Sequence, residues 1–136
     1  MNDLTQLDEA ELIARFLAAE TFGVVGVSRD PSKYGHKVLA HYLARGRRAI
    51  PIHPRETEIL GQRVYASLSD VTEAIDAVSI ITPPQVTETV VEEIAANGIP
   101  LVWMQPGAES ASAVAKARDL GLGVIHGGPC VMVVLR

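Results

Sequence analysis

Hydrophobic residues in this chain follow two alternating patterns. Short continuous apolar runs lie at residues 22–27, 49–52, 77–82, 101–104 and 124–126. Over residues 34–44, apolar residues instead recur every three or four positions, which is the spacing of an amphipathic helix. Further helices are expected over residues 87–97, which end in Asn-Gly, and over residues 109–120, which are rich in Ala. Continuous apolar runs are typical of parallel strands that are covered on both faces. The pattern therefore predicts successive strand–helix–strand units.

Such units predict an α/β fold, with a Rossmann-like, doubly wound, five-stranded parallel sheet and helices on both faces. We expect the strand order 3-2-1-4-5, counting the five apolar runs along the chain. Residues 55–67 are expected to be irregular, with a short extended piece at 63–65, and Ser67 is expected to cap a short helix that ends at residue 72. We expect one domain over residues 1–136, on which an amphipathic helix at residues 4–20 packs.

In sheets of this kind, ligands bind at the carboxyl ends of the strands, where the strand order reverses. With the expected order, this place is the crevice between the first and the fourth strand. Five segments that follow strands should meet there, namely residues 28–35, 53–55, 82–84, 105–107 and 127–130. All five are rich in Gly, Pro, Ser, Thr or Gln, and their only carboxylate is Asp30. This composition favours a ligand site.

The first of these segments indicates what kind of ligand is bound. A buried strand runs directly into a loop with Gly26, Ser28, Lys33 and Gly35, and a helix begins at about Tyr34. Backbone N–H groups at a helix N-terminus bind phosphate, and glycine lets the chain approach the anion closely. The loop is longer than the compact G-x-G-x-x-G turn, so it predicts a phosphate-bearing ligand without specifying a dinucleotide.

The second segment argues against NAD. Sheets that bind NAD carry Asp or Glu near the end of the second strand, about 20 residues beyond the glycines. This chain has His53, Pro54 and Arg55 there instead. A phosphorylated ribose suits such a segment, and both NADP and coenzyme A (CoA) contain one. The pair Pro83-Pro84 then offers a rigid surface beside an adenine or a pantetheine arm, or merely ends one strand and begins the next helix.

The candidate ligand-binding residues all belong to these strand ends. They are Gly26, Val27, Ser28, Arg29, Lys33, Tyr34, Gly35, His53, Pro54, Arg55, Thr82, Pro83, Pro84 and Gln105. Charge supports the choice, because residues 29–63 hold eight of the twelve basic residues and only three acids.

Composition limits the remaining possibilities. The net charge of −4 speaks against nucleic acid as a partner. No apolar run reaches the roughly 20 residues that cross a bilayer, so we expect no membrane contact. The single cysteine, Cys130, cannot form an internal disulfide or a cysteine-based zinc site. With an acidic start that fits neither a signal nor a transit peptide, the sequence leads us to expect a cytoplasmic protein.

Five motifs together resemble the small stand-alone CoA-binding domain proteins, which are relatives of the N-terminal CoA-binding domain of the succinyl-CoA synthetase alpha subunit. The motifs are VVGVSRDPSKYGHKV, YLARGRRAIPIHP, ILGQRVYASLSD, IDAVSIITPPQ and GIPLVWMQPG, and the resemblance runs from about residue 21 to residue 130. It implies a Rossmann-like fold that binds CoA with its diphosphate against residues 28–35. Residues 53–55 would lie near the phosphorylated ribose, and residues 82–84 along the cofactor. Members commonly carry Val-Asn-Pro where this chain has Ile-His-Pro at residues 52–54.

The residues themselves do not form a catalytic arrangement. The four histidines, at positions 36, 41, 53 and 126, lack the spacing of a metal site. The only candidate nucleophile is Cys130, for which a mixed disulfide with the CoA thiol is one hypothesis. We therefore expect a protein that binds CoA or an acyl-CoA as a non-catalytic carrier, sensor or subunit, although catalysis stays open. The alternative is an NADP-binding oxidoreductase or redox sensor. A homodimer or a protein partner also remains open.

Overall fold

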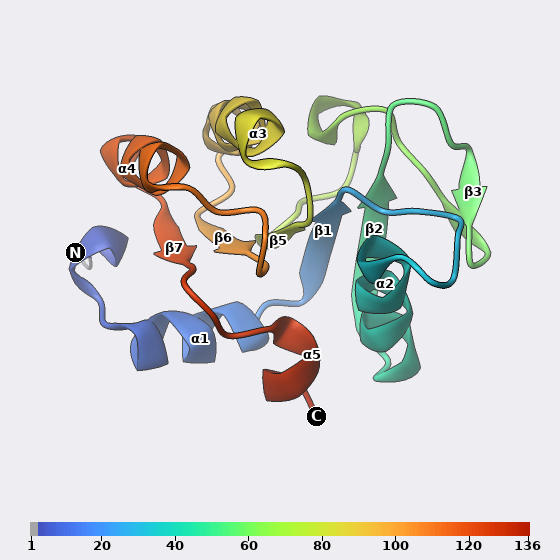
Figure 1. The fold of residues 1–136 in the computed structure, drawn as a ribbon, viewed down its shortest axis with the longest axis horizontal. Helices are drawn as coiled ribbons and strands as arrows, with labels where there is room; N and C mark the ends of the chain where they lie inside the picture. Colours follow the sequence, from blue (N-terminus) through green and yellow to red (C-terminus); the bar gives the residue numbers. More distant parts are fainter. Residues whose placement is uncertain (1–2) are drawn as a thin grey trace.

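A five-stranded parallel sheet forms the centre of the computed structural model, which describes residues 3–136. Its strands are β1 (Thr21–Val25), β2 (Arg48–Ile52), β5 (Ala77–Ile80), β6 (Leu101–Met104) and β7 (Gly123–Ile125). The helices are α1 (Glu9–Leu17), α2 (Tyr34–Ala44), α3 (Pro84–Ala96), α4 (Ala111–Asp119) and α5 (Val131–Val134). Figure 1 shows α1, α2 and α5 on one face of the sheet and α3 and α4 on the other. The predicted α/β fold class is confirmed.

The strand order differs from the prediction in one respect. The observed order is β2-β1-β5-β6-β7, so the third apolar run pairs with β1 and does not lie outside β2. Pro51 in β2 supplies a physical reason. Its carbonyl oxygen accepts a hydrogen bond from Tyr65 N on the outer edge of β2, at 3.1 Å. The nitrogen of a strand residue faces the same edge as its carbonyl, and proline has no N–H to offer there. β2 is therefore suited to be an edge strand.

The segment between β2 and β5 covers this outer edge. Its strands β3 (Glu58–Ile59) and β4 (Gln62–Arg63) form a small antiparallel hairpin, and Tyr65 then makes a single parallel bridge with Ile52. The expected extended piece at residues 63–65 is thus confirmed in part. A single 3₁₀ turn, η2 (Leu68–Asp70), replaces the expected longer helix. The segment brings Ser67 and Leu68 next to α3.

The amino-terminal helix is shorter than expected. A 3₁₀ turn, η1 (Leu4–Gln6), precedes α1, and the two are separated because Asp8 begins a new helix. The Asp8 carboxylate accepts a hydrogen bond from Glu11 N at 2.8 Å, which is the usual geometry of an N-cap. Leu12 and Phe16 of α1 pack into the core on the α2 face.

Two apolar clusters, one on each face of the sheet, hold these layers together. On the α2 face, the centroid of the Phe16 ring lies 5.2 Å from the centroid of the Trp103 ring and 5.4 Å from that of the Phe22 ring. On the other face, Val91 and Ile94 of α3 are fully buried. No helix within residues 3–136 is long and apolar enough to cross a membrane.

Candidate functional site

The sheet reverses its strand order between β1 and β5, so the crevice lies there and not between the first and fourth strands as predicted. Gly26 follows β1 and Ile81 follows β5, and the two backbones touch. A Cβ atom on Gly26 would lie 2.4 Å from the Ile81 carbonyl oxygen, and Gly26 has a φ of +98°. Only glycine permits this close approach at the reversal point.

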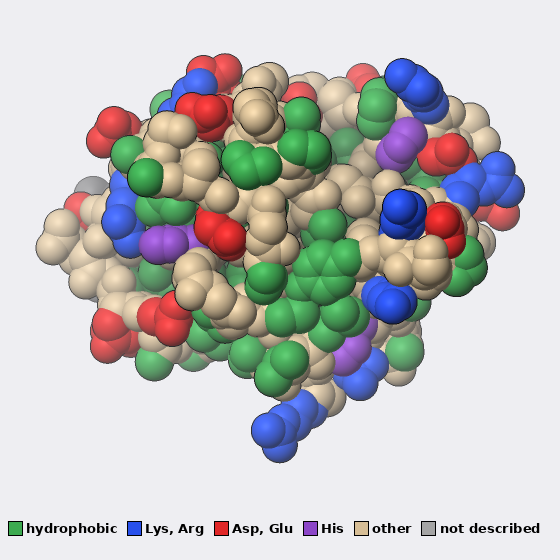
Figure 2. Space-filling model, in the orientation of Figure 1, with side chains coloured by type: hydrophobic (Ala, Val, Ile, Leu, Met, Phe, Trp, Pro, Cys, Tyr) green, Lys and Arg blue, Asp and Glu red, His purple; other side chains and the backbone are tan. Residues whose placement is uncertain are grey.

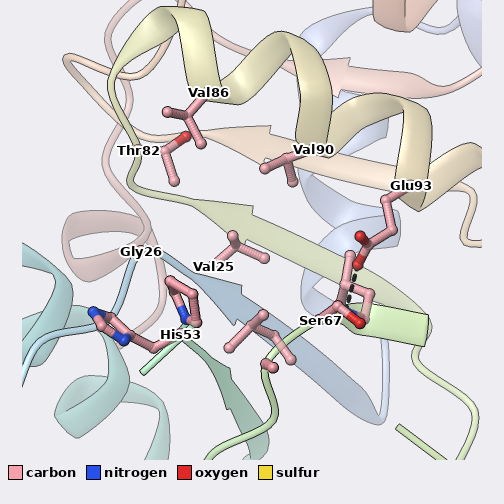
Figure 3. A pocket seen from close by; sticks show the side chains of 12 residues that line it. Val25, Gly26, His53, Ser67, Thr82, Val86, Val90 and Glu93 are labelled. Atoms are coloured by element: carbon pink, nitrogen blue, oxygen red, sulfur yellow. Dashed lines mark hydrogen bonds between the residues drawn. The ribbon is translucent and has the colours of Figure 1, made fainter. Parts of the chain in front are cut away.

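A pocket of about 230 Å³ opens beside this contact, between the carboxyl ends of β1, β2 and β5 and the helix α3 (Figure 3). Most of its wall is apolar. The lining residues are Val25, Gly26, Ile52, His53, Pro54, Ala66, Ser67, Leu68, Thr82, Val86, Val90 and Glu93. Pockets that bury a whole drug-sized ligand usually measure about 300–1,000 Å³. This pocket therefore suits one apolar, flat part of a longer ligand.

His53 forms one corner of the pocket and also shapes the turn that follows β2. Its Nδ1 accepts hydrogen bonds from Arg55 N at 3.0 Å and from Glu56 N at 3.1 Å. Because Nδ1 accepts, the proton of the neutral ring is on Nε2. An Asn side chain performs the same task in many turns. His53 therefore holds the backbone at residues 53–56 in a fixed turn.

The loop between β1 and α2 is held by its own polar side chains. The Asp30 carboxylate accepts hydrogen bonds from the backbone N–H and the hydroxyl of Ser32, and these bonds lower the pKa of Asp30. Ser28 Oγ accepts from Asp30 N at 3.1 Å. The Nδ1 of His36 lies 2.9 Å from the Ser28 carbonyl oxygen, to which it donates. These hydrogen bonds fix the shape of the loop.

The loop leads into the N-terminus of α2, where Gly35 allows a second close approach. A Cβ atom on Gly35 would lie 2.1 Å from the Gly26 carbonyl oxygen. The N-cap position is Lys33, and within the described residues no side chain caps the first turn of α2. Such a turn has backbone N–H groups and a partial positive charge available for an anion.

Basic side chains surround the loop, as Figure 2 shows on the right of the molecule. Arg29, Lys33 and Arg55 are all exposed. The Arg29 guanidinium lies 3.4 Å from the Glu56 carboxylate, which ties the loop to the turn after β2. Arg29 is exposed and Glu56 is half-buried, so this pair near the surface contributes little to stability. Its effect is to keep two basic segments side by side.

Gln105 follows β6, as predicted, but its side chain lies inside the fold. It is fully buried, and its Oε1 accepts hydrogen bonds from Val131 N at 3.0 Å and from the Tyr34 hydroxyl at 3.2 Å. Tyr34 Oη also lies 2.7 Å from Cys130 Sγ. Burial, followed by the hydrogen bond to Cys130, raises the pKa of Tyr34. Gln105 therefore links the start of α2 to the last segment of the chain.

Only some of the predicted site residues at this edge of the sheet line the pocket. Gly26, His53, Pro54 and Thr82 line the pocket. Val27 is buried in the core on the α2 face, and Pro84 is the first residue of α3. Thr82 and Pro83 border a second hollow, together with Pro106 and Gly107. The first pocket and this hollow thus adjoin at Thr82.

Sequence reasoning missed the wall that α3 contributes. Val86, Val90 and Glu93 face the pocket from successive turns of the helix, as Figure 3 shows. Their spacing of four and three residues marks one helix face, and this was the available signal. The sequence alone did not indicate that this face borders a pocket. Within residues 3–136, no group of three or more His, Cys, Asp or Glu side chains is placed to hold a metal ion.

The β1–α2 loop and the apolar pocket lie next to each other at the reversal point of the parallel sheet, which is where such sheets bind ligands. Comparison with known proteins gives the family. Over residues 20–136 the chain matches the CoA binding domain, and it belongs to that family. The resemblance stated from the sequence motifs is thereby confirmed.

Individual relatives include short and long proteins. An uncharacterized protein YneT from Bacillus subtilis (strain 168) is 27% identical over 117 residues, which are 86% of this chain and 87% of that protein. A hypothetical protein from Pyrococcus horikoshii OT3 has a solved structure with a TM-score of 0.86 at 25% identity, covering 98% of this chain and 93% of the other. The ADP-forming acetate–CoA ligase of Methanocaldococcus jannaschii is 29% identical over 80 residues, which are 59% of this chain but only 11% of that protein.

Proposed function

We propose that this protein binds coenzyme A, or an acyl-CoA, across the carboxyl ends of β1, β2 and β5. The observation that carries the proposal is the contact between the apolar pocket and the β1–α2 loop at Gly26, which lines the pocket and begins the loop. CoA needs such a combination because it joins an adenine to a diphosphate. The family supports CoA binding in general. The placement of each part of the ligand is our proposal.

The diphosphate is assigned to the β1–α2 loop and the first turn of α2. Gly26 and Gly35 bring the backbone close together there, and the first turn has no side-chain cap within residues 3–136. Lys33 and Arg29 add positive charge from the solvent side. A helix N-terminus with free N–H groups and nearby cations stabilises a diphosphate.

The adenine is assigned to the pocket, between Val25 on the sheet and Val90 on α3. The ribose then lies near His53 and Pro54, and its 3′-phosphate within reach of the exposed Arg55. Arg55 belongs to the turn that His53 holds and directly follows Pro54, which lines the pocket. The chain has His53 where NAD-binding sheets carry an Asp or Glu that accepts hydrogen bonds from the ribose diol, so NAD is expected to bind poorly.

In this proposal the chain acts as a non-catalytic carrier, sensor or subunit that holds CoA. The pantetheine arm leaves the pocket past Thr82 and Pro83, along the second hollow. Because the chain matches only a small part of the acetate–CoA ligase, the activity of that enzyme is not transferred to it.

Calorimetric titration with CoA, dephospho-CoA, NADP and NAD tests the proposal. CoA should bind most tightly, dephospho-CoA more weakly because it lacks the 3′-phosphate, and NAD negligibly. Ligand at about 100 times its dissociation constant should also raise the free energy of unfolding by roughly 2.7 kcal/mol. A preference for NADP over CoA would overturn the assignment and favour the oxidoreductase alternative.

A pair of arginine variants locates the 3′-phosphate. Arg55→Ala should weaken CoA far more than dephospho-CoA, since only CoA carries the phosphate that Arg55 meets. Arg45→Ala is the matched control, because Arg45 is an exposed arginine that follows the last residue of α2, at the end away from the loop. If Arg55→Ala lowers the affinity for CoA and for dephospho-CoA by the same factor, Arg55 does not contact the 3′-phosphate.

A further inference from the structure

Glu93 brings a carboxylate to a pocket whose wall is mostly apolar. Among the pocket-lining residues of the described chain, it is the only acid. We infer that Glu93 selects adenine over 6-oxopurines, by accepting a hydrogen bond from the 6-amino group of the base. The inference rests on the proposed CoA binding and adds a determinant of base specificity to it.

The position of Glu93 fits this task. In Figure 3 Glu93 and Ser67 lie at one end of the pocket, while His53 and Gly26 lie at the other. The β1–α2 loop, to which we assign the diphosphate, begins at Gly26. A nucleotide whose phosphates lie at this loop therefore points its base toward Glu93. Val90, one turn earlier on α3, lies between the two ends and packs against the base.

The carboxylate is held in place by the backbone of η2. Glu93 Oε1 accepts a hydrogen bond from Leu68 N, whose side chain also lines the pocket. This bond uses one carboxylate oxygen, and we assign the second oxygen, Oε2, to the ligand. A fixed side chain loses little conformational freedom when the ligand binds, which favours selectivity.

The chemistry of the carboxylate explains the preference. An ionised carboxylate only accepts hydrogen bonds, and the 6-amino group of adenine donates. Hypoxanthine and guanine carry a 6-oxo group at this position, which is an acceptor. Two facing acceptors repel each other, and the carboxylate would lose its hydrogen bonds to water without compensation.

The same geometry predicts what Glu93→Gln would do. Leu68 N still requires an acceptor, so the amide oxygen of the new side chain faces Leu68. The amide NH₂ group then faces the base, where it donates to a 6-oxo group and opposes a 6-amino group. The substitution should therefore reverse the preference and keep the bond that fixes η2.

The test is calorimetric titration with CoA and with its 6-oxo analogue, in which hypoxanthine replaces adenine. Wild-type protein should bind CoA about tenfold to hundredfold more tightly than the analogue, the range expected for one charge-assisted hydrogen bond. Glu93→Gln should favour the analogue. Glu92→Gln is the matched control, because Glu92 is exposed and pairs with Lys116 at 2.5 Å outside the pocket.

The outcomes separate the two proposals. Equal binding of CoA and the analogue by the wild-type protein would overturn the role of Glu93 and leave CoA binding intact. A proportional loss of both ligands in Glu93→Gln would show a purely structural role and also overturn the inference. If the wild-type protein binds neither ligand, the proposed function fails, and the base assignment fails with it. The wild-type comparison needs no variant, so it holds even if Glu93→Gln does not fold.

Discussion

Gly26 and Gly35 are in backbone contact across the β1–α2 loop, and the Cβ atom of any side chain at position 35 would lie 2.1 Å from the Gly26 carbonyl oxygen. Non-bonded carbon and oxygen atoms do not approach so closely, so the two residues fix how α2 leaves the sheet. The first turn of α2 thereby comes to lie against the carboxyl end of β1.

Gly35→Ala should therefore both destabilise the protein and weaken the binding of CoA. The clash is with backbone, which cannot rotate away, so we expect a loss of about 3 kcal/mol, at the upper end of overpacking costs. Urea unfolding measures the stability, and titration with CoA measures the binding. Gly98→Ala is the control, because Gly98 has a φ of +70° but, apart from its two chain neighbours, no residue of the described part of the chain lies within 4 Å of its Cβ position. It should lose only about 1–2 kcal/mol from backbone strain and should keep its affinity for CoA.

His53 should be replaceable by asparagine but not by alanine. The Oδ1 atom of Asn can accept from the N–H groups of Arg55 and Glu56, as His53 Nδ1 does. His53→Asn should change the free energy of unfolding by less than about 0.5 kcal/mol, whereas His53→Ala should cost about 1 kcal/mol. Thermal unfolding of the two variants distinguishes them. If both lose the same stability, the turn does not depend on this acceptor.

Gln105→Leu should destabilise the protein more than Tyr34→Phe. The leucine leaves the buried Val131 N–H without its acceptor, which should cost about 1–3 kcal/mol, while the phenylalanine removes only a hydroxyl. The double variant should lose less free energy of unfolding than the sum of the losses of the two single variants, because the two residues share one hydrogen bond. Denaturant unfolding of the four proteins of this cycle gives the coupling. Strict additivity would mean that the contact between Tyr34 and Gln105 does not stabilise the fold.

Two tyrosines should make the protein sensitive to alkali. Burial is the main cause that raises the pKa of Tyr34 and of Tyr42 above their ordinary value. In the unfolded chain both lose a proton near pH 10, while the folded protein keeps it, so the unfolded state binds fewer protons above that pH. The contribution of these two tyrosines to the free energy of unfolding is fully present below pH 10 and declines as the pH rises further. Unfolding between pH 8 and pH 11.5 measures the decline, which should be shallower in Tyr42→Phe than in wild type.

Much of the fold could be predicted from local patterns. The limits of α2 and β6 agree with the prediction, because their apolar spacing is regular and their ends have clear signals, such as Gly46 after α2. The strand order was wrong because it depends on the path of residues 55–67, which lack a regular pattern. The clue lay in Pro51, whose missing donor favours an edge.

The part of the pocket wall that follows directly from strand ends was predictable. Gly26, His53 and Thr82 line the pocket because the carboxyl ends of parallel strands meet at one edge. Glu93 was missed because a helix face is assigned to a pocket only when the neighbouring layer is known. Gln105 was chosen for its place after a strand, yet the fold buries it beneath the loops.

Pro51 affects more than the strand order. The row of hydrogen-bonding groups along the outside of β2 is interrupted at this proline, and Tyr65 occupies the acceptor beside it. A foreign strand would find a gap in its ladder at that point, which makes the edge a poor template for aggregation. Pro51, which favours an edge position for β2, thus also hinders the pairing of other chains with this edge.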